Sequence, residues 1–307
     1  MKKTGRQIIK EFKDELFTKS LKPPSQKKKR EVKTILVSCS GGRTSMMLAK
    51  WIKDSPQYKD YNKVYAYCNT GKEREETLIF INKCDKEFNL NIVWIESVIN
   101  KEKGVGSGFK IVDFETANRN GAIFEEMIQV YGIPNSSFPH CTRELKIIPI
   151  HKFMKSLGVG EYLTAIGIRA DEQHRVNWEY AKKERYIYPF ITDFRVDSLY
   201  IRKFWEAQCF DLGLKDYEGN CDMCYKKSNR KLLTMVEESP NLIKWWDNME
   251  ELYGDGYTFY RGNKSAKDLI EESKRPFTKA IDLFELHKMT SPMFDNNMDQ
   301  EESCFCK

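Results

Sequence analysis

The residues best suited to chemistry lie in one short run near the start of the chain, S-C-S-G-G-R-T-S at residues 38–45. An apolar stretch precedes the run, and residues 46–52 have the spacing of a helix. Glycines let the backbone approach an oxyanion, and the first N–H groups of a helix point at it. We expect nucleotide contacts from seven residues of the run: Ser38, Ser40, Gly41, Gly42, Arg43, Thr44 and Ser45. An ordinary strand–turn–helix connection uses the same residue types.

Cysteines form the second group that could do chemistry. A C-x-x-C pair stands at Cys221 and Cys224, and a C-x-C pair, Cys304 and Cys306, closes the chain. Two close pairs and one further cysteine are enough for a tetrahedral thiolate site, for zinc or an iron–sulfur cluster. The C-x-x-C is also compatible with a redox pair that holds no metal.

Four other cysteines fall in apolar strand or helix patterns, where packing in the core is the expected role: Cys39, Cys68, Cys84 and Cys209.

The elements that would position these residues alternate between strands and helices. Apolar runs at 35–37, 63–70, 91–96 and 162–168 predict strands, and residues 75–88 and 122–131 predict helices. This alternation predicts an α/β fold, a parallel twisted sheet with flanking helices. Ligands of such sheets lie beyond the carboxyl ends of the strands. We therefore expect further nucleotide contacts at the ends of the other strands: Asn69, Thr70, Gly167 and Arg169.

The later part of the chain changes in character. We divide the sequence into a basic N-terminal helix and linker at 1–33, a nucleotide-binding domain at 34–192, and a helical, cysteine-containing region at 193–307. Helices are expected at 197–210, 228–237 and 242–253, and residues 257–261 are expected to form a packed strand.

Composition excludes several classes of protein. The 307 residues are 40% hydrophobic, with no apolar run as long as the roughly 18 residues of a membrane span. No apolar segment of a secretory signal follows the basic N-terminus, and nine cysteines without such a signal point to reduced thiols. We therefore expect a cytoplasmic protein with no membrane contact, and the sequence is compatible with a homo-oligomer.

The net charge of +6 is concentrated near the N-terminus. Six basic residues surround a Pro-Pro pair: Lys22, Lys27, Lys28, Lys29, Arg30 and Lys33. Such a run can bind nucleic acid through its phosphates, although a solvated linker is the simpler interpretation.

The S-G-G-R-T-S run resembles the PP-loop, S-G-G-x-D-S, of the ATP-pyrophosphatases and of the adenylyl-sulfate (APS) and phosphoadenylyl-sulfate (PAPS) reductases. In the pyrophosphatases the acidic position of this motif helps to handle magnesium, and here it is Thr44. The resemblance implies an adenine nucleotide α-hydrolase-like fold and an adenine nucleotide, PAPS, APS or ATP. It leaves magnesium-dependent ATP cleavage open.

Two further segments extend this resemblance to the PAPS reductase-like family. The run from His140 to Ile150 is similar to the family's C-C-x-x-R-K-V-x-P-L, with Cys141, Lys146 and Pro149 matching. The run from Gly167 to Arg175 is similar to its G-x-R-x-x-x-x-x-R. The matched segments are spread from residue 35 to about residue 225. Together they imply substrate contacts from Arg143, Lys146, His174 and Arg175.

The interval from Cys141 to Cys221 is similar to that in cluster-bearing APS reductases, which implies a [4Fe–4S] site. Its ligands would be Cys141, Cys221, Cys224 and, because Thr142 replaces the family's second cysteine, Cys306 or Cys304. A structural zinc site of Cys221, Cys224, Cys304 and Cys306 is the alternative.

The resemblance implies an enzyme that reduces an adenylyl sulfate. Cys304 or Cys306, when not bound to a metal, would attack the sulfur, and a thioredoxin-like reductant would resolve the product. The family's terminal E-C-G-x-H motif is absent, since the chain ends S-C-F-C-K. Two alternatives stay open: cluster-dependent sulfur transfer to tRNA or DNA, and a non-catalytic nucleotide-binding protein with a zinc-stabilised tail.

Overall fold

The computed structural model describes residue 7 and residues 32–102, 104–219 and 221–282. The basic run at 22–30, Cys304 and Cys306 lie outside these residues. No helix in the described part of the chain is both long and apolar enough to cross a membrane.

A six-stranded sheet forms the centre of the fold, in the order β4-β3-β2-β1-β5-β6. Its strands are β1 (Thr34–Ser38), β2 (Asn62–Asn69), β3 (Val93–Val98), β4 (Gly108–Val112), β5 (Leu163–Ala165) and β6 (Tyr186–Ile187). All neighbours are parallel except β3 and β4. The expected α/β class is confirmed, but the sequence predicted neither of the two edge strands, β4 and β6.

Helices lie between and after the strands. The α-helices are α2 (Arg43–Asp54), α3 (Glu75–Phe88), α4 (Ala122–Tyr131), α5 (His140–Thr142), α6 (Ile148–Ser156), α7 (Trp178–Glu184), α8 (Pro189–Thr192), α9 (Ser198–Glu206), α10 (Asn229–Glu238), α11 (Lys244–Tyr253) and α12 (Ala266–Ser273). A single turn of 3₁₀-helix occurs at η1 (Pro56–Tyr58), a longer, kinked 3₁₀ segment at η3 (Ala170–Arg175), and η2 (Arg143–Ile147) is a π-helix. The helices at 75–88 and 122–131 agree with the sequence expectation, whereas residues 257–261 form no strand beyond one bridge from Tyr260 to Lys264.

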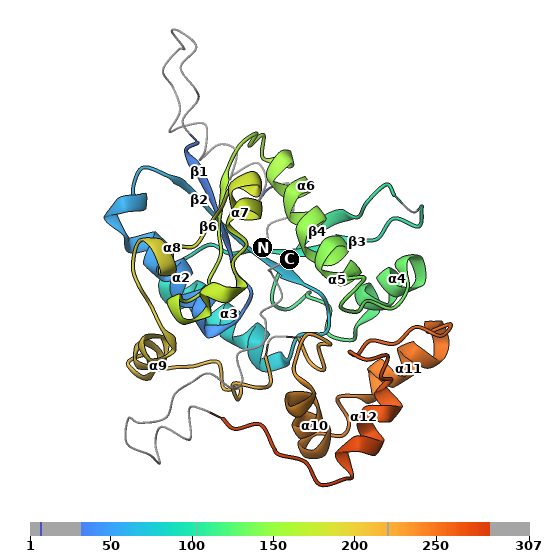
Figure 1. Ribbon diagram of the computed structural model, residues 1–307. Helices are drawn as coiled ribbons and strands as arrows, with labels where there is room; N and C mark the ends of the chain where they lie inside the picture. Colours follow the sequence, from blue (N-terminus) through green and yellow to red (C-terminus); the bar gives the residue numbers. More distant parts are fainter. Residues whose placement is uncertain (1–6, 8–31, 103, 220, 283–307) are drawn as a thin grey trace.

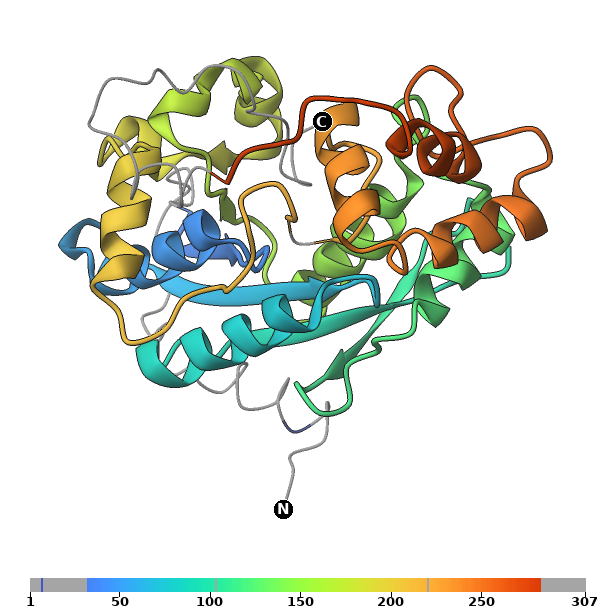
Figure 2. The same ribbon diagram turned by 90° about the horizontal axis from the view of Figure 1, so that it is seen from below.

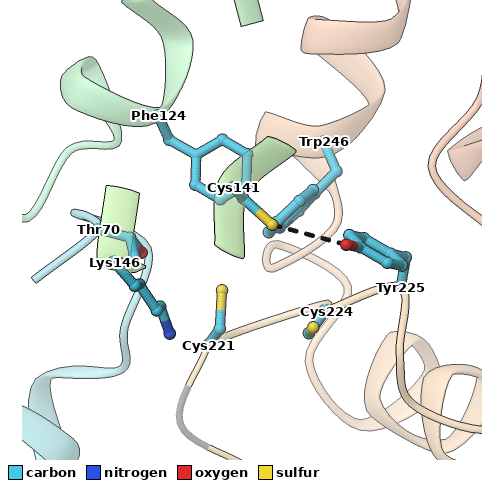
Figure 3. Close-up of a pocket in the computed structure, with 8 residues that line it drawn as sticks. All are labelled: Thr70, Phe124, Cys141, Lys146, Cys221, Cys224, Tyr225 and Trp246. Carbon is cyan, nitrogen blue, oxygen red and sulfur yellow. Dashed lines mark hydrogen bonds between the residues drawn. The ribbon is translucent and has the colours of Figure 1, made fainter. Parts of the chain in front are cut away.

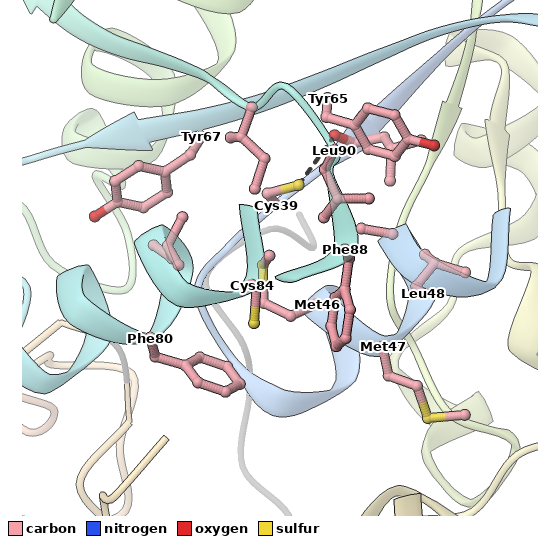
Figure 4. Close-up of a cluster of buried hydrophobic side chains, with 14 of the residues drawn as sticks. Cys39, Met46, Met47, Leu48, Tyr65, Tyr67, Phe80, Cys84, Phe88 and Leu90 are labelled. Atoms are coloured by element: carbon pink, nitrogen blue, oxygen red, sulfur yellow. Dashed lines mark hydrogen bonds between the residues drawn. The ribbon is translucent and has the colours of Figure 1, made fainter. Parts of the chain in front are cut away.

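Alternation along the strands divides the core between the two faces of the sheet. Ile35 and Val37 pack in the large cluster with α2, α3 and α9, and Leu36 packs on the other face with α6. This period of two is the ordinary consequence of strand geometry. Cys39 and Cys84 lie inside the large cluster (Figure 4), and Cys68 lies in the other. Burial raises the pKa of all three thiols, that of Cys68 to about 12.

Cys209 is an exception among the expected core cysteines, because it is exposed. The helix expected to reach residue 210 ends at Glu206, so Cys209 lies in the following loop, where no helical face turns it inward.

The C-terminal helices α10, α11 and α12 gather at one end of the molecule beside α4 (Figures 1 and 2). Their shared cluster contains Phe124 and Met127 of α4, Trp246 of α11 and Leu269 of α12. The cluster also contains Cys141 and Cys221, which places both cysteines where the sheet domain meets the C-terminal helices.

Candidate functional site

The loop after β1 has a conformation that only glycine tolerates well. Gly41 has φ +82°, and a Cβ there would stand 2.5 Å from Cγ2 of Thr77 and 2.8 Å from Cδ1 of Ile81. The loop therefore lies directly on α3. Gly42 precedes α2 as its N-cap and provides no capping side chain, and no acidic residue lies in the first turn. Helix α2 begins at Arg43, three residues earlier than its apolar spacing indicated.

Hydroxyl groups brace this loop from within. Ser40 Oγ donates to Ser45 Oγ at 2.9 Å, and Ser45 Oγ donates to the Gly42 carbonyl at 2.9 Å. Ser38 ends β1 and is buried. The loop therefore keeps one shape without a ligand, which is the preorganisation that an anion site at a helix start requires.

Arg43 is turned away from the loop toward a later segment of the chain. Its Nε donates to Asp211 Oδ1 at 2.7 Å, its guanidinium also donates to the Leu214 carbonyl, and Asp216 lies 3.7 Å away. Burial raises the pKa of Asp211, but the hydrogen bonds and charge of Arg43 outweigh it, so the pKa is below its usual value. Arg43 thus ties residues 211–216 to the start of α2.

The end of β5 lies against the same turn. A Cβ on Gly167 would stand 3.0 Å from Ser45 Cα and 3.1 Å from Ser45 N, so Gly167 permits close approach of the two backbones. Arg169 follows as the N-cap of η3 and is held by Asp171 at 2.9 Å. Arg175 pairs with Glu172 at 2.8 Å. The expected neighbours Gly167 and residues 38–45 therefore do meet, and both arginines are bound by nearby carboxylates.

At the end of β2 the two expected contacts differ. Asn69 is fully buried, and its Nδ2 donates to Glu96 Oε1 at 2.7 Å and to the Asn118 carbonyl at 2.8 Å. Both amide hydrogens are therefore used inside the protein, which gives Asn69 a supporting role. Thr70 donates from its N and Oγ1 to Glu73 at 2.9 Å, and it also lines a pocket.

That pocket brings together three of the expected metal ligands (Figure 3). Its lining consists of Thr70, Phe124, Cys141, Lys146, Cys221, Cys224, Tyr225 and Trp246. Cys141 approaches the hydroxyl of Tyr225 at 3.6 Å. The thiols of Cys141 and Cys221 point toward one another across the space in Figure 3. Residues separated by 80 positions in the sequence thus share one site.

A π-helical turn positions the first part of this pocket. Cys141 lies in α5 and Lys146 in η2, and the two run without a break into α6. Insertions of this kind are rare and occur often at functional sites. Lys146 is buried close to the Glu73 carboxyl. Burial of Glu73 raises the pKa of its carboxyl, and the positive charge of Lys146 only partly offsets this rise.

Three of the expected substrate contacts are not part of the pocket lining: Arg143, His174 and Arg175. Arg143 is 55% exposed and its guanidinium bonds to the buried Glu144. His174 is exposed in η3. Within the described ranges, no three His, Cys, Asp or Glu side chains are close enough to hold a metal ion together. The fourth expected ligand, Cys306 or Cys304, lies outside those ranges.

The structure also shows residues that the sequence interpretation missed. Phe124, Tyr225 and Trp246 complete the pocket, and Asp211 and Asp216 hold Arg43. A run of acids at 211, 216, 218 and 222 before and within the C-x-x-C segment was the available signal. The aromatic residues carried no comparable signal, because core packing explains them equally well in the sequence.

Comparison with known proteins finds two relatives, both uncharacterized. No family model matches the chain. It is 23% identical over 239 residues to an uncharacterized protein of Methanocaldococcus jannaschii, a match that covers 75% of this chain and 44% of that protein.

A second relative is more similar. The chain is 32% identical over 201 residues to the uncharacterized nin region protein ORF290 of Escherichia phage lambda. The match covers 64% of this chain and 67% of the phage protein. On this extent of identity, the chain belongs to the same family as the nin region protein ORF290 of phage lambda.

Proposed function

We propose that this chain is an adenine-nucleotide-binding enzyme of sulfur chemistry, similar to the PAPS reductases, which reduces an adenylyl sulfate by means of thiols. The observation that carries the proposal is the pocket of Cys141, Cys221 and Cys224. Lys146 and Thr70 share its lining, and Thr70 follows the strand next to β1. A cation and three thiols therefore lie at the sheet edge where a ligand of a parallel sheet is expected.

The topology supports the nucleotide half of the proposal. β1 has β2 on one side and β5 on the other, so the chain changes direction across the sheet between β1 and β5. Ligands of open α/β sheets bind at such a switch point. Residues 38–45 and Gly167 are located there, with the uncapped start of α2 available to a phosphate or sulfate group.

The donor chemistry of the pocket fits a thiolate-bound group. Cys141, Cys221 and Cys224 would hold it, and Cys306 or Cys304 would be the fourth ligand. A four-iron cluster is bound at a different iron by each cysteine, whereas zinc draws all its ligands to one point. The three thiols line one pocket, which is compatible with either group, and the resemblance to cluster-bearing APS reductases favours the cluster. Such a group would supply thiolate-bound iron next to the substrate.

The chain's own residues would then bind the substrate and place its sulfur. The phosphates would bind at residues 38–45, and the sulfate would face Arg169 and Lys146. The thiolate of Cys304 or Cys306, whichever is not a metal ligand, would attack the sulfur, and the S–O bond to the nucleotide would break. A thioredoxin-like dithiol would release sulfite from the resulting thiosulfonate and would itself become a disulfide.

Sulfur transfer to tRNA or DNA is the second candidate. In this scheme Cys141, Cys221 and Cys224 would hold the cluster, which would supply an iron open to sulfur, and neither terminal cysteine would be needed as a ligand. ATP would then activate the acceptor, and Thr44 at the acidic position of the loop counts against that step.

Anaerobic purification with iron, sulfide, zinc and nucleotide analysis tests the proposal. We expect a brown protein that absorbs at about 400 nm, as an iron–sulfur cluster does. It should bind an adenine nucleotide and convert PAPS or APS to sulfite in the presence of a dithiol. Exchange of pyrophosphate into ATP that depends on tRNA or DNA would instead support sulfur transfer. A colourless protein with zinc that binds nucleotide and turns over neither substrate would contradict both enzymatic schemes.

A further inference from the structure

A buried ion pair joins the loop after β2 to the C-x-x-C segment. Nζ of Lys72 lies 3.2 Å from Oδ2 of Asp222, and the two side chains are only 10% and 11% exposed. The backbones meet as well: Asp222 N donates to the Lys72 carbonyl at 2.9 Å, and Glu73 forms an antiparallel bridge with Cys221. Cys221 and Asp222 are therefore both tied to the loop after β2.

Aromatic rings enclose this ion pair. The Lys72 ammonium lies 4.5 Å from the ring centroid of Trp245, and Trp246 Nε1 donates to the other carboxylate oxygen of Asp222 at 2.8 Å. A buried carboxylate is stable only when its oxygens are satisfied, and here a cation and an indole satisfy one oxygen each. Trp246 also lines the pocket, so the pair and the pocket share a wall.

The surrounding backbone is fitted to the lysine stem. Gly121 precedes α4, and a Cβ there would stand 2.8 Å from Cδ of Lys72 and 2.8 Å from Cε2 of Trp245. A side chain at residue 121 would therefore push the lysine off its ring. Four segments of the chain, at residues 72, 121, 222 and 245–246, converge on one ammonium group.

We propose that Lys72 is a positioning residue for the cysteine pocket. By pairing with Asp222 it holds the Cys221–Cys224 loop against the end of β2, so that the Cys221 thiol faces Cys141 and Lys146. It acts through Asp222 and need not touch a ligand. The inference rests on the proposed function only in treating these thiols as working groups.

The role predicts a local effect on thiol exposure. Without the pair, only backbone contacts hold the loop against the end of β2, and Cys221, which is 8% exposed, becomes more accessible through local opening. Cys68 should stay protected, because it packs in a separate cluster under α6. Cys209 is exposed in the folded protein and gives the reference rate of alkylation.

The test is a timed alkylation of the full-length protein with N-ethylmaleimide, read at each cysteine by peptide mass spectrometry. The protein is first reduced and freed of metal with a chelator, and no nucleotide is added. The main variant is the double substitution Lys72→Met with Asp222→Asn, which removes both charges and so leaves neither one buried alone. Lys264→Met with Glu272→Gln removes an ion pair elsewhere in the same helical region and is the matched control.

We expect the rate at Cys221, relative to Cys209, to rise about tenfold in the main variant. It should stay unchanged in the control, and Lys72→Arg should largely restore protection because it keeps a cation for Asp222. An unchanged rate at Cys221 in the main variant would overturn the proposal. An equal rise at Cys68 would also overturn it, since the pair would then support the whole fold. A protein that binds no nucleotide would fail the proposed function but leave this result intact.

Discussion

The proposed nucleotide-binding region, formed by residues 38–45 with Gly167 and called the nucleotide edge below, differs from the cysteine pocket in how it is built. The edge is mostly one continuous run, and its shape comes from glycine backbone and from hydroxyls bonded to each other. The pocket takes its lining from the ends of four distant segments, near residues 70, 124, 141–146 and 221–246. Local sequence therefore determines the first region, whereas the second depends on the docking of the C-terminal helices.

The two regions also treat their carboxylates differently. At the nucleotide edge Asp211 is partly exposed, and its hydrogen bonds to Arg43 lower its pKa below the usual value. At the pocket Asp222 is deeply buried, and burial raises its pKa despite the charge of Lys72. The Arg43–Asp211 pair at the edge is thus close to solvent, whereas the Lys72–Asp222 pair beside the pocket is buried. Each prediction below changes one region and leaves the other as its reference.

The largest effect is expected at the pocket thiols. Cys221→Ser should abolish the absorption near about 400 nm, because serine does not replace a thiolate ligand of an iron–sulfur cluster. Nucleotide affinity should stay within about twofold, since the edge is built from other residues. Cys209→Ser changes an exposed cysteine and serves as the control. Retention of the full spectrum in Cys221→Ser would contradict the ligand assignment.

Gly41→Ala should destabilise the nucleotide edge most. The new Cβ would clash with Thr77 and Ile81 in a left-handed conformation, at a cost of about 2–4 kcal/mol in the free energy of unfolding. Gly158→Ala has a similar φ of +78° with nothing within 4 Å, so it isolates the conformational part. Urea unfolding compares the two, and equal losses would show that the contact with α3 is unimportant.

A smaller effect is expected where β5 meets α2. Gly167→Ala places a Cβ 3.0 Å from Ser45 Cα, and we expect a loss of about 1 kcal/mol and weaker nucleotide binding as the loop shifts. Gly160→Ala, with nothing within 4 Å of its Cβ, is the matched control. Calorimetric titration with PAPS and ATP measures the affinity. Unchanged affinity in Gly167→Ala would place the ligand elsewhere.

The smallest effect should be a pair of opposite pH dependences. A lowered folded pKa stabilises the protein above the unfolded value, and that stability is lost as pH falls, so the cost of Asp211→Asn should shrink below about pH 4. A raised folded pKa favours the folded state as pH falls from the folded value to the unfolded value, so the stability of wild type relative to Asp222→Asn should rise as pH falls toward about 4 and stay level below it. In urea unfolding at several pH values, each difference in unfolding free energy between wild type and variant should change by about 1 kcal/mol per pH unit. Changes of the same sign for the two variants would contradict the comparison.

The sequence predicted the regular parts of the fold well. Residues 75–88 have clear helical spacing, and the helix occupies that range. Strand β4 was missed because it is short and begins among glycines, where no apolar alternation marks it. The expected strand at 257–261 was wrong, because burial of Phe259 and Tyr260 against α11 produces an apolar run without a neighbouring strand.

The candidate site divides in the same way. A local motif singled out residues 38–45, and the three cysteines that the family resemblance grouped do line one pocket, while the roles of both groups stay predictions. The sequence did not predict that Asn69 turns inward to Glu96, or that carboxylates hold Arg43 and Arg169. Those contacts depend on segments that only the tertiary fold brings together.

The central claim is that the nucleotide edge and the cysteine pocket serve one reaction. The most direct measurement is a titration of the anaerobically purified protein with PAPS, APS and ATP, followed by the visible and electron paramagnetic resonance spectra of the cluster. We predict that one of these nucleotides changes the spectra with a midpoint equal to its dissociation constant, and that Cys209→Ser responds identically. A nucleotide that binds without any change in the spectra, or a protein without a cluster, would contradict the account.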